Sequence, residues 1–517
     1  MEIFNENNYK HISSDMFTLA HDEEKITDTK LETKPVGYFK DAFNRFKKNK
    51  SSMAAAIIIL FLFAFALFVP FFSNYDVTFR DGYYKMLLPK SHIFQWLGWD
   101  GCRWQTVSQG GYDSLAAIGY EYGSSSIKKA KDPDVMSNGT FYDVYVDSYE
   151  KVGFAYVDLP EADYIALKNY QNETGIQVCY PIPQNYLTNY LSVSNGANLW
   201  YKLADTSTKT TGVAAQHDEN GYPIFENNYI VKESKTYGRY DSLRIPGDDG
   251  GSDGKSWYVY AIRNQTGYKV RVLYSAYYEY KNGFQPMHLF GTNQHGQDIF
   301  ACLAIGARLS FILAISVSFL NFIIGVCYGA VEGYYGGAID LIMERISDIL
   351  ASVPFIVVAT LFQLHLANRV GAVPALLFAF VFTGWIGIAS RVRTQFYRFK
   401  NSEYVLAART LGASDSRLIF RHVLPNSLGT IITGTILIIP GVIFSESMLT
   451  YLGIVNLETS GLTSIGTMLS NGQAYLATFP HILMFPAVFI SLLEISFNLF
   501  GNGLRDAFNP ALRGSDE

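Results

Sequence analysis

The segment RVRTQFYRFKNSEYVLAARTLGASDSRLIFRHVLPN, residues 391–426, is a polar, basic island between two long apolar runs. Residues 403–410 favour a helix, and Gly412 can end that helix in the left-handed conformation. Ser414 or Asp415 can cap a second helix that runs on to Pro425. We therefore predict two short helices joined by a glycine turn, exposed between two membrane segments.

The composition of the whole chain favours a membrane protein. Of its 517 residues, 49% are hydrophobic and only 17% are charged, which is unusual for a soluble protein with such long apolar runs. A helix of about 20 apolar residues crosses a hydrocarbon core of about 30 Å. Six stretches qualify, the last two with one glutamate each: 54–72, 309–331, 349–367, 370–390, 428–452 and 479–504. The predicted fold class is a polytopic α-helical membrane protein with about six transmembrane helices.

Lysines and arginines gather before the first span, within 391–426 and after the sixth span. If the spans alternate in direction, all three clusters fall on one side, and the positive-inside rule makes that side cytoplasmic. We thus expect a mobile cytoplasmic N-terminus at 1–35 and a cytoplasmic tail at 506–517. Residues 36–53 are an amphipathic lead-in, either a helix on the inner leaflet, with Phe39, Phe43 and Phe46 at helical spacing, or an ordinary flanking helix.

Residues 73–290 are predicted to form an extracytoplasmic domain between the first and second spans. Their composition changes to tyrosine, asparagine, glycine and aspartate. The alternating stretches 141–146 (FYDVYV) and 257–262 (WYVYAI) indicate strands. A hairpin turn at 264–267 leads into a further strand over 268–280. We expect a β-rich or α+β fold for this insert, followed by a permease-like core over 291–505.

Two of the four cysteines, Cys102 and Cys179, fall in the external insert, where a disulfide could form. The spacing does not say whether they lie close together, so the pairing is left open. No metal site is predicted, because the nine histidines are scattered along the chain.

The basic island resembles the EAA loop of ABC-importer permeases, with its E-Y-V-x-A-A-R-x-L-G-A-S…I…H-x-L-P pattern. The matching residues are Glu403, Tyr404, Val405, Ala407, Ala408, Arg409, Leu411, Gly412, Ala413, Ser414, Ile419, His422, Leu424 and Pro425. Leu406 stands where the general motif has a glutamate. The resemblance implies a type I ABC-importer permease-like fold.

Other segments resemble the C-type permease subunit of the dipeptide and oligopeptide (binding-protein-dependent) family. They include 291–298 (GTNQHGQD), 306–310 (GARLS), 333–337 (GYYGG) and 501–510 (GNGLRDAFNP). Asn293 and Gln297 replace charged residues of the family pattern. The large external insert is a departure, because most members have a short loop there.

The resemblance implies a permease subunit that forms half of a translocation path for oligopeptides or dipeptides in the bacterial plasma membrane. The expected partners are a second homologous permease, two ABC ATPase subunits, an extracytoplasmic peptide-binding lipoprotein, the peptide substrate and membrane lipids, but no nucleic acid. The chain contains no G-x-x-x-x-G-K-[ST] motif, so ATP and Mg²⁺ are expected on the partner subunits and the chain itself is not expected to be an enzyme. The residues expected to couple to the ATPase are Glu403, Ala407, Ala408, Arg409, Gly412, Ala413, Ser414, Asp415, His422 and Pro425.

Two carboxylates fall inside predicted spans, where ionisable groups face a bundle interior or water. Glu446 and Glu494 are therefore candidates for the translocation path or the interface with the partner permease. A structural hydrogen bond is the favoured alternative for Glu446, and a packing role is an equal alternative for Glu494.

Other functions stay open at the level of sequence. The same machinery imports nickel or other small solutes in related systems. A membrane-anchored receptor or adhesin would act through the external insert alone. The insert could also capture peptide itself.

Overall fold

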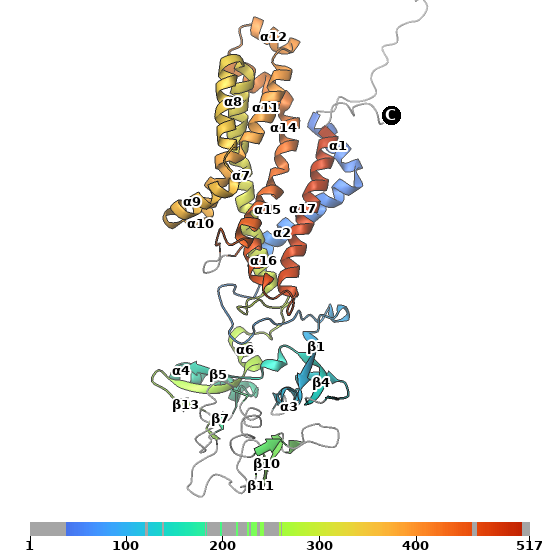
Figure 1. Cartoon of the computed structure of the whole chain (residues 1–517), viewed down its shortest axis with the longest axis vertical. Helices are drawn as coiled ribbons and strands as arrows, with labels where there is room; N and C mark the ends of the chain where they lie inside the picture. Colours follow the sequence, from blue (N-terminus) through green and yellow to red (C-terminus); the bar gives the residue numbers. More distant parts are fainter. Residues whose placement is uncertain are drawn as a thin grey trace, which may run out of the picture.

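The computed structural model has two parts, a bundle of long helices and a sheet-containing domain at one end of it (Figure 1). It describes residues 38–118, 122–136, 139–180, 182–183, 197–198, 261–457 and 463–508, and short strands between 213 and 259. The segment 1–35, predicted to be mobile, and the tail beyond residue 508 lie outside the described residues.

The first two helices run down one side of the bundle. Helix α1 (Tyr38–Lys48) is followed at once by α2 (Lys50–Phe72), whose N-cap Asn49 accepts a hydrogen bond from the backbone N–H of Ser52. In α1, Phe46 is buried against Phe500 with ring centroids 5.3 Å apart, whereas Phe43 is 56% exposed. Helix α1 therefore packs on the bundle through one edge and exposes an aromatic ring beside its lysines.

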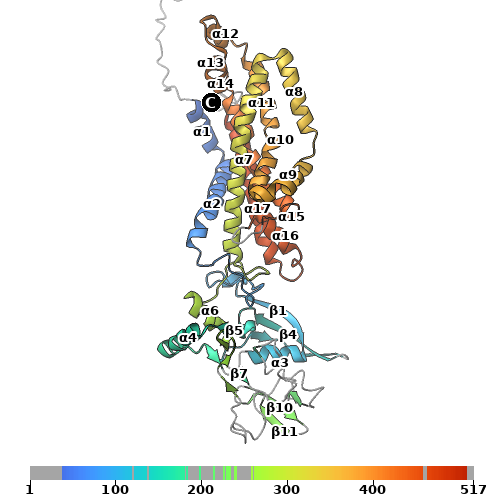
Figure 2. The ribbon, with the colours of Figure 1, turned by 90° about the vertical axis from the view of Figure 1, so that its left-hand side faces the viewer.

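Helix α7 (Ile299–Tyr335) is the central rod of the bundle and runs from the sheet domain to the opposite end (Figure 2). At 1.5 Å per residue its 37 residues span about 55 Å, well beyond a hydrocarbon core of about 30 Å. The predicted span 309–331 is thus only the middle of a longer helix.

The predicted third span, 349–367, is wrong as a single straight helix. Helix α8 (Gly337–Ala351) and helix α9 (Phe355–Val370) meet at an angle of 73°. Pro354 at the break has no N–H to donate and disfavours helical conformation in the residue before it. The apolar run is continuous in sequence, but the helix axis is not.

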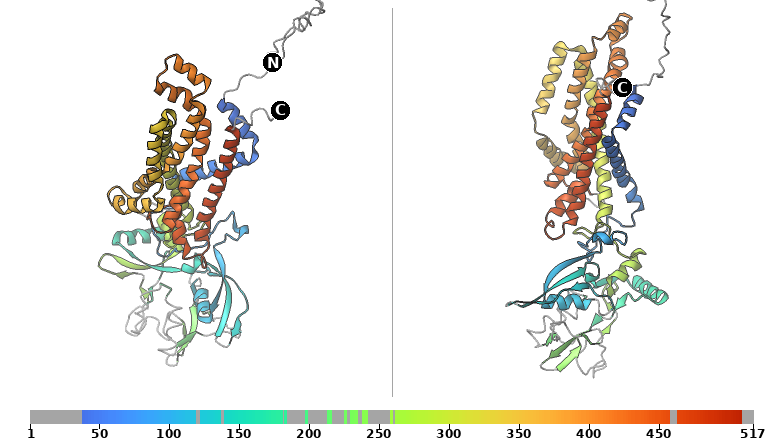
Figure 3. Two further views of the ribbon diagram at one scale, coloured as in Figure 1. Left: turned by 45° about the horizontal axis from the view of Figure 1, so that its top comes forward. Right: turned by 90° about the vertical axis from the view of Figure 1, so that its right-hand side faces the viewer.

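The remaining helices form three more membrane-length stretches. Helices α10 (Ala372–Gly384) and α11 (Ile386–Phe399) form one apolar stretch, and the rod Asp415–Tyr451 forms another. Helix α16 (Ile465–Gln473) is short, and α17 (His481–Phe508) runs the length of the bundle beside α2 (Figure 3). Among the described residues, five helical stretches are long and apolar enough to cross a membrane, or six if the bent α8–α9 pair counts as one span. The structure therefore confirms a polytopic helical protein.

One sheet of the terminal domain forms around β4 (Gly139–Asp147), which contains the predicted strand 141–146. It pairs with β1 (Cys102–Ser108), β2 (Ile127–Ala130) and β3 (Asp134–Met136), all antiparallel. Helix α3 (Gln109–Ile118) covers this sheet, and the rings of Tyr112 and Tyr142 stack 4.3 Å apart between them. The short helix η3 (Gln95–Leu97) precedes β1.

A second sheet forms around β14 (Tyr268–Leu273). Its partners are β5 (Phe154–Leu159), β6 (Cys179–Tyr180) and β13 (Ile262–Arg263), with η4 (Glu150–Val152) before β5 and α4 (Glu161–Thr174) after it. Two smaller sheets lie farther out: β8 (Val213–Ala215), β9 (Phe225–Glu226), β10 (Tyr229–Ser234) and β11 (Gly238–Asp241) form one, and β7 (Ile182–Pro183) with β12 (Tyr258–Val259) the other. The expectation of a β-containing insert is confirmed.

The hairpin at 264–267 is confirmed, but the strand predicted to follow it is too long. The Asn264 side chain accepts hydrogen bonds from the backbone N–H groups of Thr266 and Gly267 and closes the turn between β13 and β14. The chain then leaves the sheet and forms helix α6 (Tyr274–Asn282), in which Tyr274 and Tyr278 are buried. These two tyrosines are four residues apart, so they would lie on one face of either a helix or a strand. The sequence spacing therefore fits both structures.

The disulfide considered between Cys102 and Cys179 is not formed. The two residues lie on β1 and β6, strands of different sheets, and both are free thiols. Loss of hydration raises the pKa of Cys102 to about 12 and that of Cys179 to about 11. Both thiols therefore stay protonated at neutral pH.

The sheet domain is tied to the bundle through residues before α7. The hydroxyl of Thr292 donates to the carbonyl of Tyr84 over 2.6 Å and accepts from the N–H of Leu87 over 2.8 Å. Asp298, the N-cap of α7, accepts from the N–H of Ala301 and lies 2.8 Å from Nδ1 of buried His288. The start of the central helix is thus fixed within the joint between the two parts.

Helix α7 packs closely against α11. Gly325, Gly329 and Gly333 are spaced four residues apart on one face of α7, and α11 lies directly against them. A Cβ added at Gly329 would lie 2.2 Å from the backbone carbonyl oxygen of Ala389. Small residues at this spacing are the usual way for membrane helices to approach closely.

We predict that Gly329→Leu lowers the free energy of unfolding by about 1–3 kcal/mol, because the added side chain forces α7 and α11 apart. The thermal midpoint of the purified chain in detergent would show the loss. Gly441→Leu is the matched control, because Gly441 is an exposed helix residue with open space at its Cβ. Equal losses in the two variants would contradict the assigned contact.

Candidate functional site

The basic island forms the tip of the bundle farthest from the sheet domain (Figure 1). Helix α12 (Glu403–Thr410) has the predicted bounds, and Gly412 follows it with φ of 82°. The N–H of Gly412 bonds to the carbonyl of Arg409, and that of Ala413 bonds to Ala408, so the turn closes the end of the helix. Ser414 takes the N-cap position of the short helix α13 (Asp415–Arg417), without a side-chain capping bond.

The second helix was predicted to end at Pro425, but it continues beyond this residue. The chain passes from α13 into a π-helical turn, η5 (Leu418–Val423), and then into α14 (Leu424–Ile436) and α15 (Ile438–Tyr451). Pro425 lies in the first turn of α14, where a missing N–H is tolerated. The tip is therefore continuous with a membrane-length helical rod.

Buried apolar side chains hold α12 against the bundle. Val405 is fully buried, and so are Leu418 and Val423 from the following turn. They belong to one hydrophobic cluster with Val392 and Phe396 of α11. One face of the tip is therefore fixed by the core, which leaves the other face free.

The outer face of the tip is apolar and cationic. Leu411 is 88% exposed, and Phe420, Leu406 and Tyr404 are between 40% and 51% exposed. Glu403, Ala407 and Arg409 are exposed as well, whereas Ala408 and His422 are half-buried. Exposed apolar side chains gathered in this way mark an interaction surface rather than an ordinary solvated loop.

Polar contacts tie the tip to the end of α7. The hydroxyl of Tyr334 donates to Oδ1 of Asp415 over 2.6 Å, and the guanidinium of Arg409 lies 5.8 Å from the Tyr334 ring centroid. Lys400, just before α12, donates to the carbonyl of Gly333 over 2.9 Å. Displacement of the tip would therefore pull directly on the central helix.

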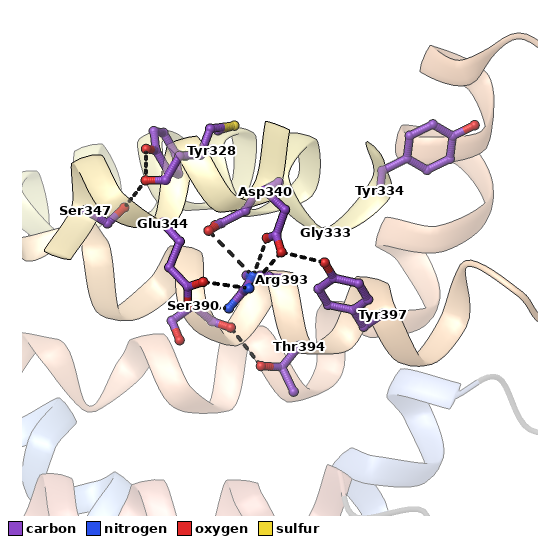
Figure 4. A network of polar contacts seen from close by, with 12 residues as sticks. Tyr328, Gly333, Tyr334, Asp340, Glu344, Ser347, Ser390, Arg393, Thr394 and Tyr397 are labelled. Atoms are coloured by element: carbon purple, nitrogen blue, oxygen red, sulfur yellow. Dashed lines mark hydrogen bonds and ion pairs between the residues drawn. The ribbon is translucent and has the colours of Figure 1, made fainter. Parts of the chain in front are cut away.

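Below the tip, Arg393 of α11 meets the carboxylates of Asp340 and Glu344 on α8 (Figure 4). Its Nε and Nη2 reach both oxygens of Asp340, at 2.5 and 2.8 Å, and its Nη1 and Nη2 reach those of Glu344, at 2.8 and 3.0 Å. Glu332 lies 3.6 Å from Nε, and the hydroxyl of Tyr397 donates to Asp340 over 2.7 Å. The arginine thus cross-links α8 to α11 through two bidentate ion pairs.

This cluster is not predicted from the sequence, where Arg393 is only one of several cations of the basic island. Its two bidentate partners, Glu344 and Asp340, lie 49 and 53 residues away in the chain. The available signal was three acidic residues, Glu332, Asp340 and Glu344, around the 333–337 turn. Three acidic residues this close together repel one another unless a cation pairs with them. The nearby basic island is the natural source of that cation.

The two intramembrane candidates lie in different environments. Glu446 is 1% exposed and accepts hydrogen bonds from the hydroxyl of Ser310 on α7, over 2.8 Å, and from that of Thr450, over 3.2 Å. Glu494 of α17 is half-buried, and its Oε1 has no hydrogen-bond partner among the described residues. Glu446 therefore makes the structural bonds that were the favoured alternative, whereas Glu494 has a polar atom left to satisfy. No cluster of three or more metal-ligating side chains is found in the described part of the chain.

The bundle is that of a multi-pass membrane protein with an exposed helical tip. Residues 321–514 match the family described as the inner membrane component of binding-protein-dependent transport systems, and residues 37–89 match the N-terminal transmembrane domain of oligopeptide transport permease C. The chain belongs to this permease family, in its oligopeptide and dipeptide C-type branch. Most of the sheet domain lies outside both matched segments.

Two relatives of known family agree with the assignment. The chain is 42% identical to the oligopeptide transport system permease protein OppC of Bacillus subtilis, over 44% of this chain and 72% of the relative. It is 40% identical to the dipeptide transport system permease protein DppC of the same organism, over 44% of this chain and 69% of the relative. Among solved structures, the MetNI methionine ABC transporter in an inward-facing conformation is 16% identical, with a TM-score of 0.32 over 39% of this chain and 96% of that one.

We predict that Arg393→Ala lowers the free energy of unfolding by about 2 kcal/mol or more, because it leaves the Asp340, Glu344 and Glu332 carboxylates facing one another without a cation. Thermal unfolding of the purified chain measures the effect. Arg345→Ala is the control, since the Arg345–Asp348 pair is exposed and such pairs contribute little. A midpoint for Arg393→Ala equal to that of the control would argue against the cross-link.

Proposed function

We propose that this chain is one of two permease subunits of an ATP-driven importer of oligopeptides or dipeptides, and that it couples to the ATPase through residues 403–426. The carrying observation is a tip that exposes Leu411 and Ala407 while its inner face is locked to the bundle. Relatives named as oligopeptide and dipeptide transport permeases support the cargo class.

The orientation proposed from the sequence places the tip in the cytoplasm and the sheet domain outside. Arg409, Arg417 and Arg421 are exposed at the tip, and α1 with its lysines lies at the same end of the bundle (Figure 2). Cations at one end of a helical bundle mark its cytoplasmic side. A separate peptide-binding lipoprotein would then deliver cargo on the side of the sheet domain.

In this proposal α12 transmits the movement of the ATPase subunits to the membrane helices. Closure of two ATPase subunits around ATP and Mg²⁺ moves the groove that holds the tip, and the tip moves α7 through the contact between Asp415 and Tyr334. A second, homologous permease forms the other half of the path. Ala407 leaves room for close approach of the partner, and Leu411 supplies an apolar contact.

We predict that the double variant Ala407→Glu/Ala408→Glu, and separately Gly412→Pro, abolish peptide-stimulated ATP hydrolysis and uptake by the reconstituted complex, or reduce them at least about tenfold. Two carboxylates would carry charge into a tight contact surface, and a proline cannot adopt the φ of 82° found at Gly412. Hydrolysis and uptake of a radiolabelled peptide in proteoliposomes are the measurements.

Asn401→Glu provides the control, because Asn401 is exposed just before α12 and the change adds one negative charge at the tip but outside the helix. Thermal unfolding separates loss of coupling from loss of folding. Normal uptake by both tip variants would refute the coupling role and shift weight to a receptor or adhesin acting through the sheet domain.

A further inference from the structure

A cavity of about 370 Å³ lies where the sheet domain meets the bundle. Its walls come from the segment 82–88, from strands β1 and β4, from residues 151–154 and from Phe479 in the loop before α17. Arg103 of β1 crosses this joint, since its Nη1 donates to the carbonyl of Thr478 over 2.7 Å and its guanidinium lies 4.4 Å from the Phe479 ring centroid. The cavity is therefore built by both parts of the molecule.

The lining carries three cations, Lys85, Arg103 and Lys151, and no carboxylate. Neither lysine has an ion pair or a hydrogen-bonded side-chain partner among the described residues. Nearby acids are engaged elsewhere: Asp147 binds Lys90 over 3.0 Å, and Glu150 accepts from Tyr122 over 2.9 Å. The lining residues themselves therefore carry an excess of positive charge, with the Lys85 and Lys151 side chains exposed to solvent.

The cations affect one another. Loss of hydration, and then the neighbouring charge of Arg103, lower the pKa of Lys151. A bound anion would relieve this repulsion. Met86, Leu88, Val152 and Phe479 supply an apolar wall, with Phe479 on the side toward the bundle. Tyr83, Gln105, Ser148 and Asn198 add polar groups to the lining.

We propose that this cavity binds the C-terminal carboxylate of a short peptide, with the carboxylate on Lys85, Lys151 and Arg103 and the last side chain on the apolar wall. A volume of about 370 Å³ falls within the range of small-molecule sites. An inorganic anion would leave the apolar wall without a partner, whereas a peptide end supplies both kinds of contact. The inference rests on the proposed function, because it makes the sheet domain a receiver of the cargo.

The test compares N-acetyl-Ala-Phe-Ala with its C-terminal amide, which differ only in the terminal charge. Binding of each to the full chain in lipid nanodiscs is measured by titration calorimetry. We expect the acid to bind at least about tenfold more tightly than the amide, since charge-assisted hydrogen bonds to the carboxylate are lost in the amide. The double variant Lys85→Gln/Lys151→Gln reduces this ratio to less than about twofold.

Lys128→Gln/Lys168→Gln is the matched control, because it removes two exposed lysines of the same domain that do not line the cavity. It should keep the wild-type ratio. If the wild type binds the acid peptide and the amide peptide with equal affinity, the proposal is overturned. Binding of an acidic surface of a partner protein would then be the alternative for the cavity. An unchanged ratio in Lys85→Gln/Lys151→Gln overturns it as well.

Uptake by the complete complex separates this inference from the proposed function. If the complex imports the acid peptide but wild type shows no preference for the acid over the amide, the cavity assignment fails and the importer proposal stands. If wild type shows the preference and the complex imports neither peptide, the site stands and the importer proposal fails.

Discussion

The close approach of α7 and α11 is the constraint on which the membrane part depends. Gly325, Gly329 and Gly333 allow the two backbones to touch over two helical turns, and no side chain larger than hydrogen fits at Gly329 without a shift. In lipid there is no hydrophobic force between helices, so packing of this kind must hold them together. The contact also decides where α11 carries Arg393, which lies one turn beyond Ala389 and so reaches the α7–α8 turn. The charged cluster and the tip above it both follow from this one register.

The two helices of the tip and the turn at Gly412 could be predicted from the local sequence. The tertiary contacts that hold the tip to the bundle could not. Helix α12 and the turn at Gly412 depend on residues within a dozen positions, so propensity and spacing suffice. The Arg393 cluster joins residues about 50 positions apart, and a sequence carries no direct record of such pairs. The bend at Pro354 was not predicted, because a hydropathy average depends only on composition and contains no information on the direction of the helix axis. The tyrosine spacing in α6 fits both the two-residue period of a strand and the 3.6-residue period of a helix. Packing against the domain core favours the helix.

The sheet domain shows a further limit of sequence inference. Its strands were recognised where alternation was strong, as in β4, but the joint to the bundle depends on single polar residues. Thr292 bridges Tyr84 and Leu87, and Gly291 packs so closely on the Leu87 carbonyl that an added Cβ would lie 2.3 Å from its oxygen. These contacts join segments about 200 residues apart, and they bring Lys85, Arg103 and Phe479 to the lining of one cavity. The cavity at the joint is therefore a product of tertiary structure alone.

The central helix connects the two ends of the molecule without a break. At one end Asp298 caps α7 inside the joint and contacts buried His288, and at the other Tyr334 bonds to Asp415 at the tip. An α-helix of 37 residues transmits a push or a rotation along its axis as a nearly rigid body, provided that its ends are fixed to what they move. Both ends of α7 meet this condition, the first through a buried carboxylate and the second through the hydroxyl of Tyr334. A movement of the tip is therefore expected to reach the joint through α7 itself, and to change the shape of the cavity beside that joint.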